Sequence, residues 1–409
     1  MAKMMLTGNA AAAWGVRLAE VDVIPAFPVT PQTEIIETLA KWIADGDLDC
    51  RFVTMDSEHS MITAAGAAAA TGARAFTATS SQGLLYGFEM FYTVAGWRVP
   101  LVMVNVSRGL SAPITLEPDH NDVLAARDSG FLQLHGETCQ EVLDLVLLAY
   151  RVAEDERVLL PALVNMDGFY LSFTREPVEV PALETVRRFL PPYQPKHAFF
   201  KASQPMAQGV VVFGGAEYSY FKYQMHLASL KALEVFREVC VEFEQLFGRA
   251  YDALDRFLVD DAEYLLVMTN SFATLGKAAV MRAREQGLKV GLVRLRLVRP
   301  FPEADIRAAL RGKRAVAVID QNISVGKGGI LYAEIASCLV NMTRKPRLLS
   351  FIGGLGGKNI SPQEFEFILT KLVEAAEREE EEPLQLLFTE DEWTAMASSK
   401  RLAGKQGVT

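Results

Sequence analysis

The alternation of short apolar runs with helical patterns constrains the fold of this chain more than any other feature. From residue 1 to about residue 180, each β-rich run is followed by a stretch in which apolar residues recur at helical spacing. Strands that alternate with helices form a parallel sheet covered on both faces, so we predict an α/β fold. The expected strands are Asp22–Ala26, Arg51–Met55, Arg74–Thr79, Leu101–Val106, Phe131–His135 and Leu160–Met166, and the expected helices are Gln32–Asp45, Ser57–Gly72, Gly83–Val94, Asp122–Asp128 and Cys139–Glu154.

A proline-rich segment then interrupts the pattern and divides the chain. Its prolines exclude a long helix, so we expect an extended arm, an irregular stretch over 206–223, and an amphipathic helix from about Tyr223 to Phe247. A second α/β unit begins near Ala262. Its expected strands are Tyr264–Thr269, Val290–Arg294, Ala315–Asp320 and Pro346–Gly353, and its expected helices are Thr274–Gln286, Glu303–Leu310, Ile330–Leu339 and Ser361–Ala376.

These patterns give four segments: 1–180, 181–255, 256–375 and 376–409. The last begins with the acidic run 377–382, which we expect to be a solvated helix end, and continues into a tail that carries Trp393. The Gly-rich sequence 353–358 lacks the spacing of a phosphate-binding loop, so we interpret it as a tight turn.

Composition excludes several classes of function. The net charge of −9 argues against a nucleic-acid surface, and neither a signal peptide nor a long apolar segment is apparent, so we expect a cytoplasmic protein without membrane contact. The four cysteines are widely separated and form no Cys-x-x-Cys motif, so we expect free thiols and no metal or iron–sulfur site on this chain. They are Cys50, Cys139, Cys240 and Cys338.

Polar residues stand at the ends of successive predicted strands, where open α/β sheets bind their ligands. Thr30 precedes Pro31 at the start of a predicted helix, where it is expected to act as the cap and to offer a hydroxyl at a positive helix end. Glu58 follows the second strand, as a first-turn acid or as a buried carboxyl suited to proton transfer. Arg108 follows a later strand, as a solvated side chain or as a clamp on a carboxylate.

The hydroxyl-rich turn 79–83 lies between a strand and a helix. It is expected to cap the helix, to line the ligand-binding edge of the sheet, or to do both. His59 and His120 are the nearest histidines, and they show no spacing typical of a hydrolase triad or a zinc site.

Taken together, these motifs resemble the alpha subunit of 2-oxoacid:acceptor oxidoreductases, whose best-known members are the pyruvate:ferredoxin oxidoreductases. The resemblance covers about residues 5 to 375. The matching stretches are 27–31 (FPVTP), 57–59 (SEH), 77–83 (TATSSQG), 104–113 (VNVSRGLSAP), 128–130 (DSG), 159–161 (LLP), 166–169 (MDGF) and 299–302 (RPFP).

The resemblance implies a thiamine-diphosphate-binding fold, with a pyrimidine-binding domain followed by a transketolase C-terminal-like domain. Glu58 would bond the pyrimidine N1′, and Thr30 and Arg108 would bind the substrate carboxylate. Pro28, Ser81 and Gln82 would also contact the cofactor. The implied reaction is the CoA-acylating oxidative decarboxylation of a 2-oxo acid to acyl-CoA and CO2.

The chain is incomplete for that reaction. Only Met166-Asp167-Gly168 resembles the Gly-Asp-Gly motif by which thiamine enzymes hold Mg2+ and the diphosphate, and no cysteine cluster is present. The metal anchor and the [4Fe-4S] clusters are therefore expected on partner subunits of beta, gamma and delta type, with CoA as co-substrate and ferredoxin or an NAD-linked subunit as acceptor. We expect a dimer of hetero-oligomers.

The substrate is less constrained than the reaction. Leu116-Glu117-Pro118 departs from the pattern that we expect of pyruvate enzymes, which leaves pyruvate and a larger or aromatic acid such as phenylglyoxylate open. Two alternatives to a catalytic subunit are a non-catalytic scaffold with the same fold and a thiamine-dependent transferase or dehydrogenase component.

Overall fold

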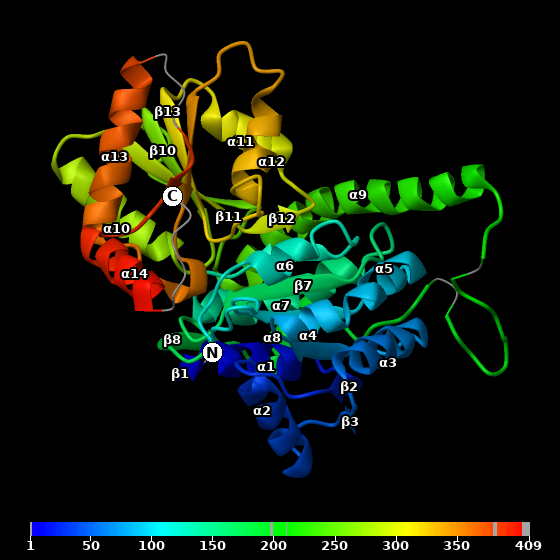
Figure 1. The fold of residues 1–409 in the computed structure, drawn as a ribbon. Coiled ribbons are helices and arrows are strands. Elements are labelled where there is room, and N and C mark those ends of the chain that lie inside the picture. Colours follow the sequence, from blue (N-terminus) through cyan, green and yellow to red (C-terminus); the bar gives the residue numbers. More distant parts are fainter. Residues whose placement is uncertain (1, 197–198, 210, 379–382, 403–409) are drawn as a thin grey trace.

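Two parallel-rich sheets flanked by helices organise the computed structural model, which describes residues 2–196, 199–209, 211–378 and 383–402 (Figure 1). The first sheet has the strand order β12-β6-β7-β5-β4. The parallel pair β2–β3 lies next to it, because Val23 bridges Ala75. The strands are β2 (Val23–Ala26), β3 (Arg51–Thr54), β4 (Phe76–Thr79), β5 (Val102–Ser107), β6 (Leu132–His135), β7 (Ala162–Asp167) and β12 (Leu297–Arg299).

Helices accompany this sheet, and all of them except the first, which the sequence analysis did not predict, lie nearly where a helix is expected. One predicted helix, Gly83–Val94, is two helices in the structure, because the chain turns at Gly87. The helices are α1 (Gly8–Leu18), α2 (Thr33–Ala44), α3 (Glu58–Ala70), α4 (Gln82–Tyr86), α5 (Phe88–Trp97), α6 (Asn121–Ala125) and α7 (Cys139–Ala153).

The second sheet has the order β15-β14-β13-β10-β11-β9, with β9 antiparallel to its neighbour. Its strands are β9 (Leu254–Phe257), β10 (Tyr264–Thr269), β11 (Val290–Leu295), β13 (Ala315–Asp320), β14 (Arg347–Ile352) and β15 (Gln385–Leu386). The helices of this unit and of the tail are α10 (Ala273–Glu285), α11 (Glu303–Leu310), α12 (Ile330–Leu339), α13 (Pro362–Glu377) and α14 (Glu390–Leu402).

The sequence patterns missed several elements. Strand β1 (Ala2–Thr7) pairs antiparallel with β8 (Arg175–Val180), and the proline-rich arm contains the short helix α8 (Leu183–Phe189). Strand β12 crosses back from the second half of the chain to pair antiparallel with β6 of the first sheet. Each of these strands is defined by a partner distant in the sequence, which local periodicity does not reveal.

The long helix α9 (Gly215–Phe247) begins eight residues before the predicted start at Tyr223, inside a stretch that we expected to be irregular. Only its second part is packed into the protein, and its first residues extend beyond the body (Figure 1). The predicted turn over 353–358 is confirmed as the 3-10 helix η1 (Leu355–Gly357), and Lys358 there pairs with Glu364. Of the acidic run, residues 379–382 lie outside the described residues.

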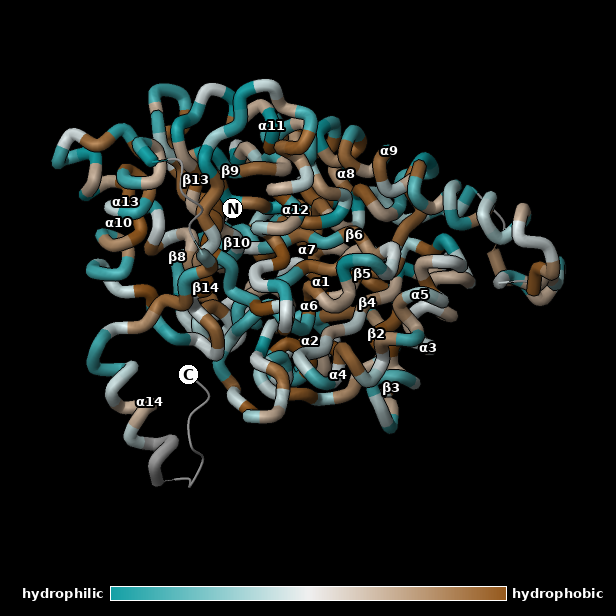
Figure 2. Tube along the Cα trace, turned by 45° about the horizontal axis from the view of Figure 1, so that its top comes forward, coloured by the Kyte–Doolittle hydropathy of each residue, from teal (hydrophilic) through white to brown (hydrophobic). Residues whose placement is uncertain are grey.

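The buried residues of the sheets and helices are mostly apolar, and the trace through the middle of the body in Figure 2 is largely brown, the colour of hydrophobic residues. One cluster crosses from the first unit to the second, since Met103 and Phe131 belong to the same buried group as Val293 and Ile306. The two units therefore share part of one core. Among the described helices, none combines the length and the apolar character needed to cross a membrane.

A buried ion network also joins the two units. The Glu141 carboxylate on α7 accepts hydrogen bonds from Arg294 on β11 (2.8 Å) and from Arg296. Arg294 further contacts Glu137 at 3.1 Å, and Lys277 on α10 contacts Glu137 at 2.6 Å. Burial opposes a charged carboxylate, but Arg294 and Arg296 outweigh it and hold the pKa of Glu141 at about 2.

Candidate active site

The carboxyl ends of the parallel strands bring the predicted site residues to one edge of the first sheet. Strands β4, β5 and β7 run parallel and adjacent, so the segments that follow them leave the sheet on the same side. Ser81 follows β4, Arg108 follows β5, and Asp167 ends β7. This is the edge where α/β sheets bind their ligands.

Asp122 organises this edge, and sequence reasoning did not single it out. Its carboxylate is fully buried and accepts hydrogen bonds from the side chains of Asn105 (3.1 Å) and Ser107 (2.9 Å) and from the backbone of Ser81 (3.1 Å). Burial raises the pKa of Asp122. The available signal was the pair of polar residues inside the otherwise apolar run of β5, because buried polar groups require partners.

Arg108 lies buried against the loop before α2 and the start of α4. Its Nη1 donates to the Thr30 carbonyl and its Nη2 to the Gln82 Oε1, each at 2.8 Å. Gln82 also donates to Ser111 and accepts from Ser81. Burial lowers the pKa of Arg108. Because no carboxylate of a described residue forms an ion pair with Arg108, its positive charge remains available to an anion.

Glu58 starts α3 and lies buried against the first turn of α4. A Cβ added at Gly83 would lie 2.6 Å from the Glu58 Oε1 and 2.7 Å from the Thr79 Oγ1, so only glycine leaves room for both groups. The buried Thr79 hydroxyl has no hydrogen-bond partner among the described residues. Within the same ranges no side-chain hydrogen bond of Glu58 is formed, but its oxygens are not among the fully enclosed unpartnered atoms. Glu58, Thr79 and Gly83, which we call the cradle, therefore place a carboxyl group beside one unsatisfied hydroxyl.

The predicted role of Thr30 as a helix cap is wrong. Helix α2 begins at Thr33, and its N-cap is Gln32, without a side-chain capping bond. The reason is that the chain turns once more after Thr30: the Gln32 amide donates to the Val29 carbonyl at 2.9 Å. Thr30 is exposed and meets Arg108 through its carbonyl. Pro28 is exposed as well, and the described contacts do not join it to the other predicted residues.

The predicted residues thus fall into two neighbouring sets. Thr30, Ser81, Gln82 and Arg108 form one hydrogen-bonded group, and Glu58 lies beside Gly83, the residue that follows Gln82. His59 stands apart on the surface, 3.4 Å from Glu89.

In the Met166-Asp167-Gly168 sequence, the Asp167 carboxylate is already hydrogen-bonded by other side chains and is not left open to a metal ion. The fully buried Asp167 carboxylate accepts hydrogen bonds from His120 Nε2 (2.8 Å) and from the backbone (3.0 Å) and hydroxyl of Ser271 in the second unit. Burial of His120 lowers the pKa of its imidazole, but the neighbouring Asp167 carboxylate outweighs burial, so the pKa of His120 is raised above its usual value. Asp167 therefore links the units, and no grouping of metal-ligating side chains occurs in the described part of the chain.

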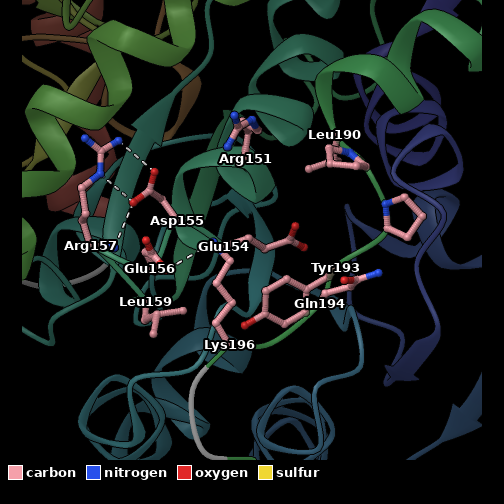
Figure 3. A pocket seen from close by; sticks show the side chains of 12 residues that line it. Arg151, Glu154, Asp155, Glu156, Arg157, Leu159, Leu190, Tyr193, Gln194 and Lys196 are labelled. Atoms are coloured by element: carbon pink, nitrogen blue, oxygen red, sulfur yellow. Dashed lines mark hydrogen bonds and ion pairs between the residues drawn. The ribbon is translucent and has the colours of Figure 1, made fainter.

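A separate cavity of about 630 Å3 lies between the end of α7 and the proline-rich arm (Figure 3). Its lining is charged but internally paired, because Arg157 contacts Asp155 at 2.9 Å and Lys196 contacts Glu156 at 3.4 Å. None of the predicted site residues lines it, so it is not part of the active-site edge.

Family models match most of the chain. Residues 14–241 match the family described as "Pyruvate flavodoxin/ferredoxin oxidoreductase, thiamine diP-bdg", and residues 262–365 match "Pyruvate:ferredoxin oxidoreductase core domain II". The first match covers the whole active-site edge described above.

Individual proteins agree with these matches. The chain is 43% identical to the pyruvate synthase subunit PorA of Pyrococcus horikoshii, over 93% of this chain and 96% of that one. It is 38% identical to the ketoisovalerate oxidoreductase subunit VorA of Pyrococcus abyssi, over the same 93% and 96%. In fold it is similar to a 2-oxoglutarate:ferredoxin oxidoreductase from Magnetococcus marinus, with a TM-score of 0.69 and 19% identity over 91% of this chain and 65% of that one. The expected thiamine-diphosphate-binding fold is confirmed.

Proposed function

Because the chain belongs to the 2-oxoacid:ferredoxin oxidoreductase family as an alpha subunit, we propose that it contributes the pyrimidine-side half of a thiamine-diphosphate site for CoA-acylating oxidative decarboxylation. The observation that carries the proposal is the cradle of Glu58, Thr79 and Gly83 next to Arg108, with which no carboxylate of the described residues forms an ion pair. The products would be an acyl-CoA and CO2, and the electrons would pass to iron–sulfur clusters on partner subunits.

The residues of the cradle suit an aminopyrimidine. A buried carboxyl that forms no side-chain hydrogen bond with the described residues can exchange one with a ring nitrogen, and the Thr79 hydroxyl, unpartnered within the same ranges, offers a second polar contact. Gly83 leaves the space for both. When bound, thiamine diphosphate supplies the carbon nucleophile and the electron sink of this chemistry. Glu58 would hold and move the proton at the pyrimidine nitrogen.

Arg108 would orient the substrate. A guanidinium held in place by Thr30 and Gln82 can grip the carboxylate of a 2-oxo acid, which fixes the neighbouring keto carbon for attack. A tight grip on the ground-state carboxylate does not itself favour loss of CO2, so the contribution of Arg108 is positioning. Thr30 and Ser81 would complete the polar wall of this pocket, with Pro28 at its exposed rim.

The remaining components are proposed to lie outside this chain. Asp167, the residue nearest in sequence to a metal motif, is occupied by His120 and Ser271, which supports a Mg2+ and diphosphate anchor on a partner subunit. CoA would act as co-substrate, and ferredoxin or an NAD-linked subunit would accept the electrons. Substrates from pyruvate to branched or aromatic 2-oxo acids remain within the proposal.

A panel of substrates tests this function. The complex purified with this chain, supplied with thiamine diphosphate, Mg2+, CoA and a viologen dye, should reduce the dye with at least one 2-oxo acid. Arg108→Ala in the same complex should raise the half-saturating concentration of that acid by roughly tenfold or more, because a charge-assisted contact is lost. The control is Arg127→Ala, because Arg127 pairs with Glu334 and contacts none of the predicted site residues in the described structure. Dye reduction by no acid, from a complex that retains its clusters, would contradict the proposed reaction.

Gly83→Ala tests the cradle. The new Cβ would collide with the ends of the Glu58 and Thr79 side chains, so we expect these groups to shift while the fold survives, with turnover reduced roughly tenfold. The control is Gly96→Ala on α5, where a Cβ would meet nothing within 4 Å. Equal turnover of the two variants, in complexes of equal thermal stability, would remove Glu58 and Thr79 from the reacting centre.

A further inference from the structure

Ser81 has a backbone conformation that normally requires glycine. It stands between β4 and α4 with a φ of 52° and a ψ of −120°. Arg98 also has a positive φ, but its ψ of 54° places it in the left-handed helical region, which other residues can enter. The angles of Ser81 lie outside that region and are those of the first central position of a type II′ turn. Glycine adopts them freely because it has no Cβ, whereas serine is strained there.

The turn around Ser81 is closed and buried. The Gly83 amide donates to the Ser80 carbonyl at 2.9 Å, which is the hydrogen bond of a four-residue turn. The Ser81 side chain is fully buried. A strained residue persists only where the surrounding structure holds it in place, and such residues gather at functional sites. The contacts of Ser81 therefore indicate what its side chain does.

Asp122 holds the strained backbone in place. Its Oδ2 accepts hydrogen bonds from the Ser81 amide at 3.1 Å and from the Arg108 amide at 3.4 Å. The same carboxylate accepts from the side chains of Asn105 and Ser107, so it is itself fixed from several sides. Ser81 follows β4, and Arg108 follows β5. One buried carboxylate thus sets the relative position of two strand ends.

The Ser81 hydroxyl orients the neighbouring Gln82 amide. Its Oγ lies 2.7 Å from the Gln82 Oε1 and 3.1 Å from the Gly109 carbonyl oxygen, so its proton has two acceptors. The Gln82 Oε1 also accepts from the Arg108 Nη2 at 2.8 Å, and the Gln82 Nε2 donates to Ser111 at 2.9 Å. Because a guanidinium can only donate, the amide oxygen of Gln82 must face Arg108. The Ser81 hydroxyl stabilises the amide in this orientation.

We propose that Ser81 is a positioning residue for Arg108. Asp122 holds the strained turn, and the Ser81 hydroxyl fixes the Gln82 amide. Gln82 and the Thr30 carbonyl then hold the two ends of the Arg108 guanidinium. This inference rests on the proposed function of Arg108, the binding of a 2-oxo acid carboxylate. It also gives a reason for a serine in a glycine conformation, since glycine would remove the hydroxyl that donates to Gln82.

Two substitutions at Ser81 separate the strain from the hydroxyl. Ser81→Gly removes both, whereas Ser81→Ala removes the hydroxyl and keeps the strain. In the purified complex, each should raise the half-saturating concentration of the 2-oxo acid by roughly threefold to tenfold, the scale of one hydrogen bond, with turnover at saturation within about twofold. The glycine variant should unfold at a higher temperature than the alanine variant. An unchanged half-saturating concentration in both variants would overturn the positioning role.

A double-mutant cycle tests whether Ser81 acts through Arg108. In the Arg108→Ala background, Ser81→Gly should leave the half-saturating concentration unchanged, because the group that Ser81 positions is gone. A further loss as large as the one that Ser81→Gly causes alone would show that the two residues act independently, and it would overturn the proposal.

Asp122→Asn tests the hold on the turn. Asparagine offers one acceptor oxygen where the carboxylate offers two, so the half-saturating concentration should rise by roughly threefold or more. The matched control is Asp144→Asn, because Asp144 is also fully buried and accepts hydrogen bonds from Arg249 and Tyr251. Both variants should unfold at a lower temperature, but only Asp122→Asn should change the half-saturating concentration. The same value in both variants would reduce Asp122 to a structural role and contradict the proposal.

Binding of oxamate separates this proposal from the proposed function. Oxamate is an unreactive analogue of a 2-oxo acid, so its affinity for the complex, measured by calorimetry, depends on carboxylate binding and not on turnover. Ser81→Gly and Asp122→Asn should each weaken it by roughly threefold or more. If no acid reduces the dye but these affinities fall as expected, the proposed reaction fails and the positioning of Arg108 stands. Dye reduction with unchanged oxamate affinity in both variants would contradict the positioning and leave the reaction intact.

Discussion

The Glu58→Gln complex is expected to assemble normally and to oxidise its 2-oxo acid at least ~10²-fold more slowly than the unsubstituted complex, on the scale of removing a general acid–base group. Glutamine preserves the size of the side chain beside Gly83 and Thr79, so packing should change little. It cannot release or take up a proton at neutral pH, so the exchange with a ring nitrogen is lost. Dye reduction under saturating cofactor and substrate is the measurement.

The control for this variant is Glu89→Gln. Glu89 lies in the first turn of α5, two helices farther along the chain, where its exposed carboxylate contacts only His59 in the described structure. Its removal should leave turnover unchanged. If Glu58→Gln were as active as Glu89→Gln, the assignment of Glu58 to the cofactor would be lost, because the carboxylate nearest to Gly83 would then have no part in turnover.

The largest expected effect on stability belongs to Glu141. Replacing it by glutamine should lower the free energy of unfolding by about 3–5 kcal/mol at neutral pH, because Arg294 and Arg296 would remain buried without their shared carboxylate. Urea denaturation followed by circular dichroism measures the change. Glu238→Gln, which breaks an exposed 2.6 Å pair with Arg157, is the matched control and should cost less than about 1 kcal/mol.

The same carboxylate gives a defined pH dependence. Its folded-state pKa of about 2 lies below the ordinary value of 4.5, so the folded state binds fewer protons than the unfolded state between these values. Stability from Glu141 is therefore complete above pH 4.5 and is lost as the pH falls toward 2, by about 3 kcal/mol in all. The gap between the unsubstituted chain and Glu141→Gln should narrow over this window. A constant gap would show that the carboxylate is not held ionised by the two arginines.

Most regular elements of the two α/β units could be predicted from the sequence, because their signals are local. Helix α11 and strands β10 and β13 have the predicted bounds, and others differ by a few residues. Strands β1, β8 and β12 could not be found this way. Each is short and gains its hydrogen bonds from a partner far along the chain, so its pattern carries no sign of the pairing.

The candidate site divides in the same manner. Arg108, Gln82 and Ser81 lie together in the structure, as strand ends of one parallel sheet should, although their functional roles stay a prediction. The predicted helix cap at Thr30 is wrong, because a turn that ends at Gln32 comes first and helix α2 begins only at Thr33. Asp122 was missed because its role comes from converging donors that lie 14 to 41 residues away in sequence. No local pattern distinguishes such a residue from an ordinary first-turn acid.

The return of β12 to the first sheet has a consequence for how the chain is made. β6 pairs with β7 on one side and receives its other neighbour only when residues Leu297–Arg299 have left the ribosome, more than 160 positions after its own end at His135. At ~5–20 residues per second, the nascent chain carries an open sheet edge for roughly ten to thirty seconds. Such an edge can pair with other chains. Cotranslational folding therefore leaves the first α/β unit vulnerable to aggregation until the second unit has been synthesised.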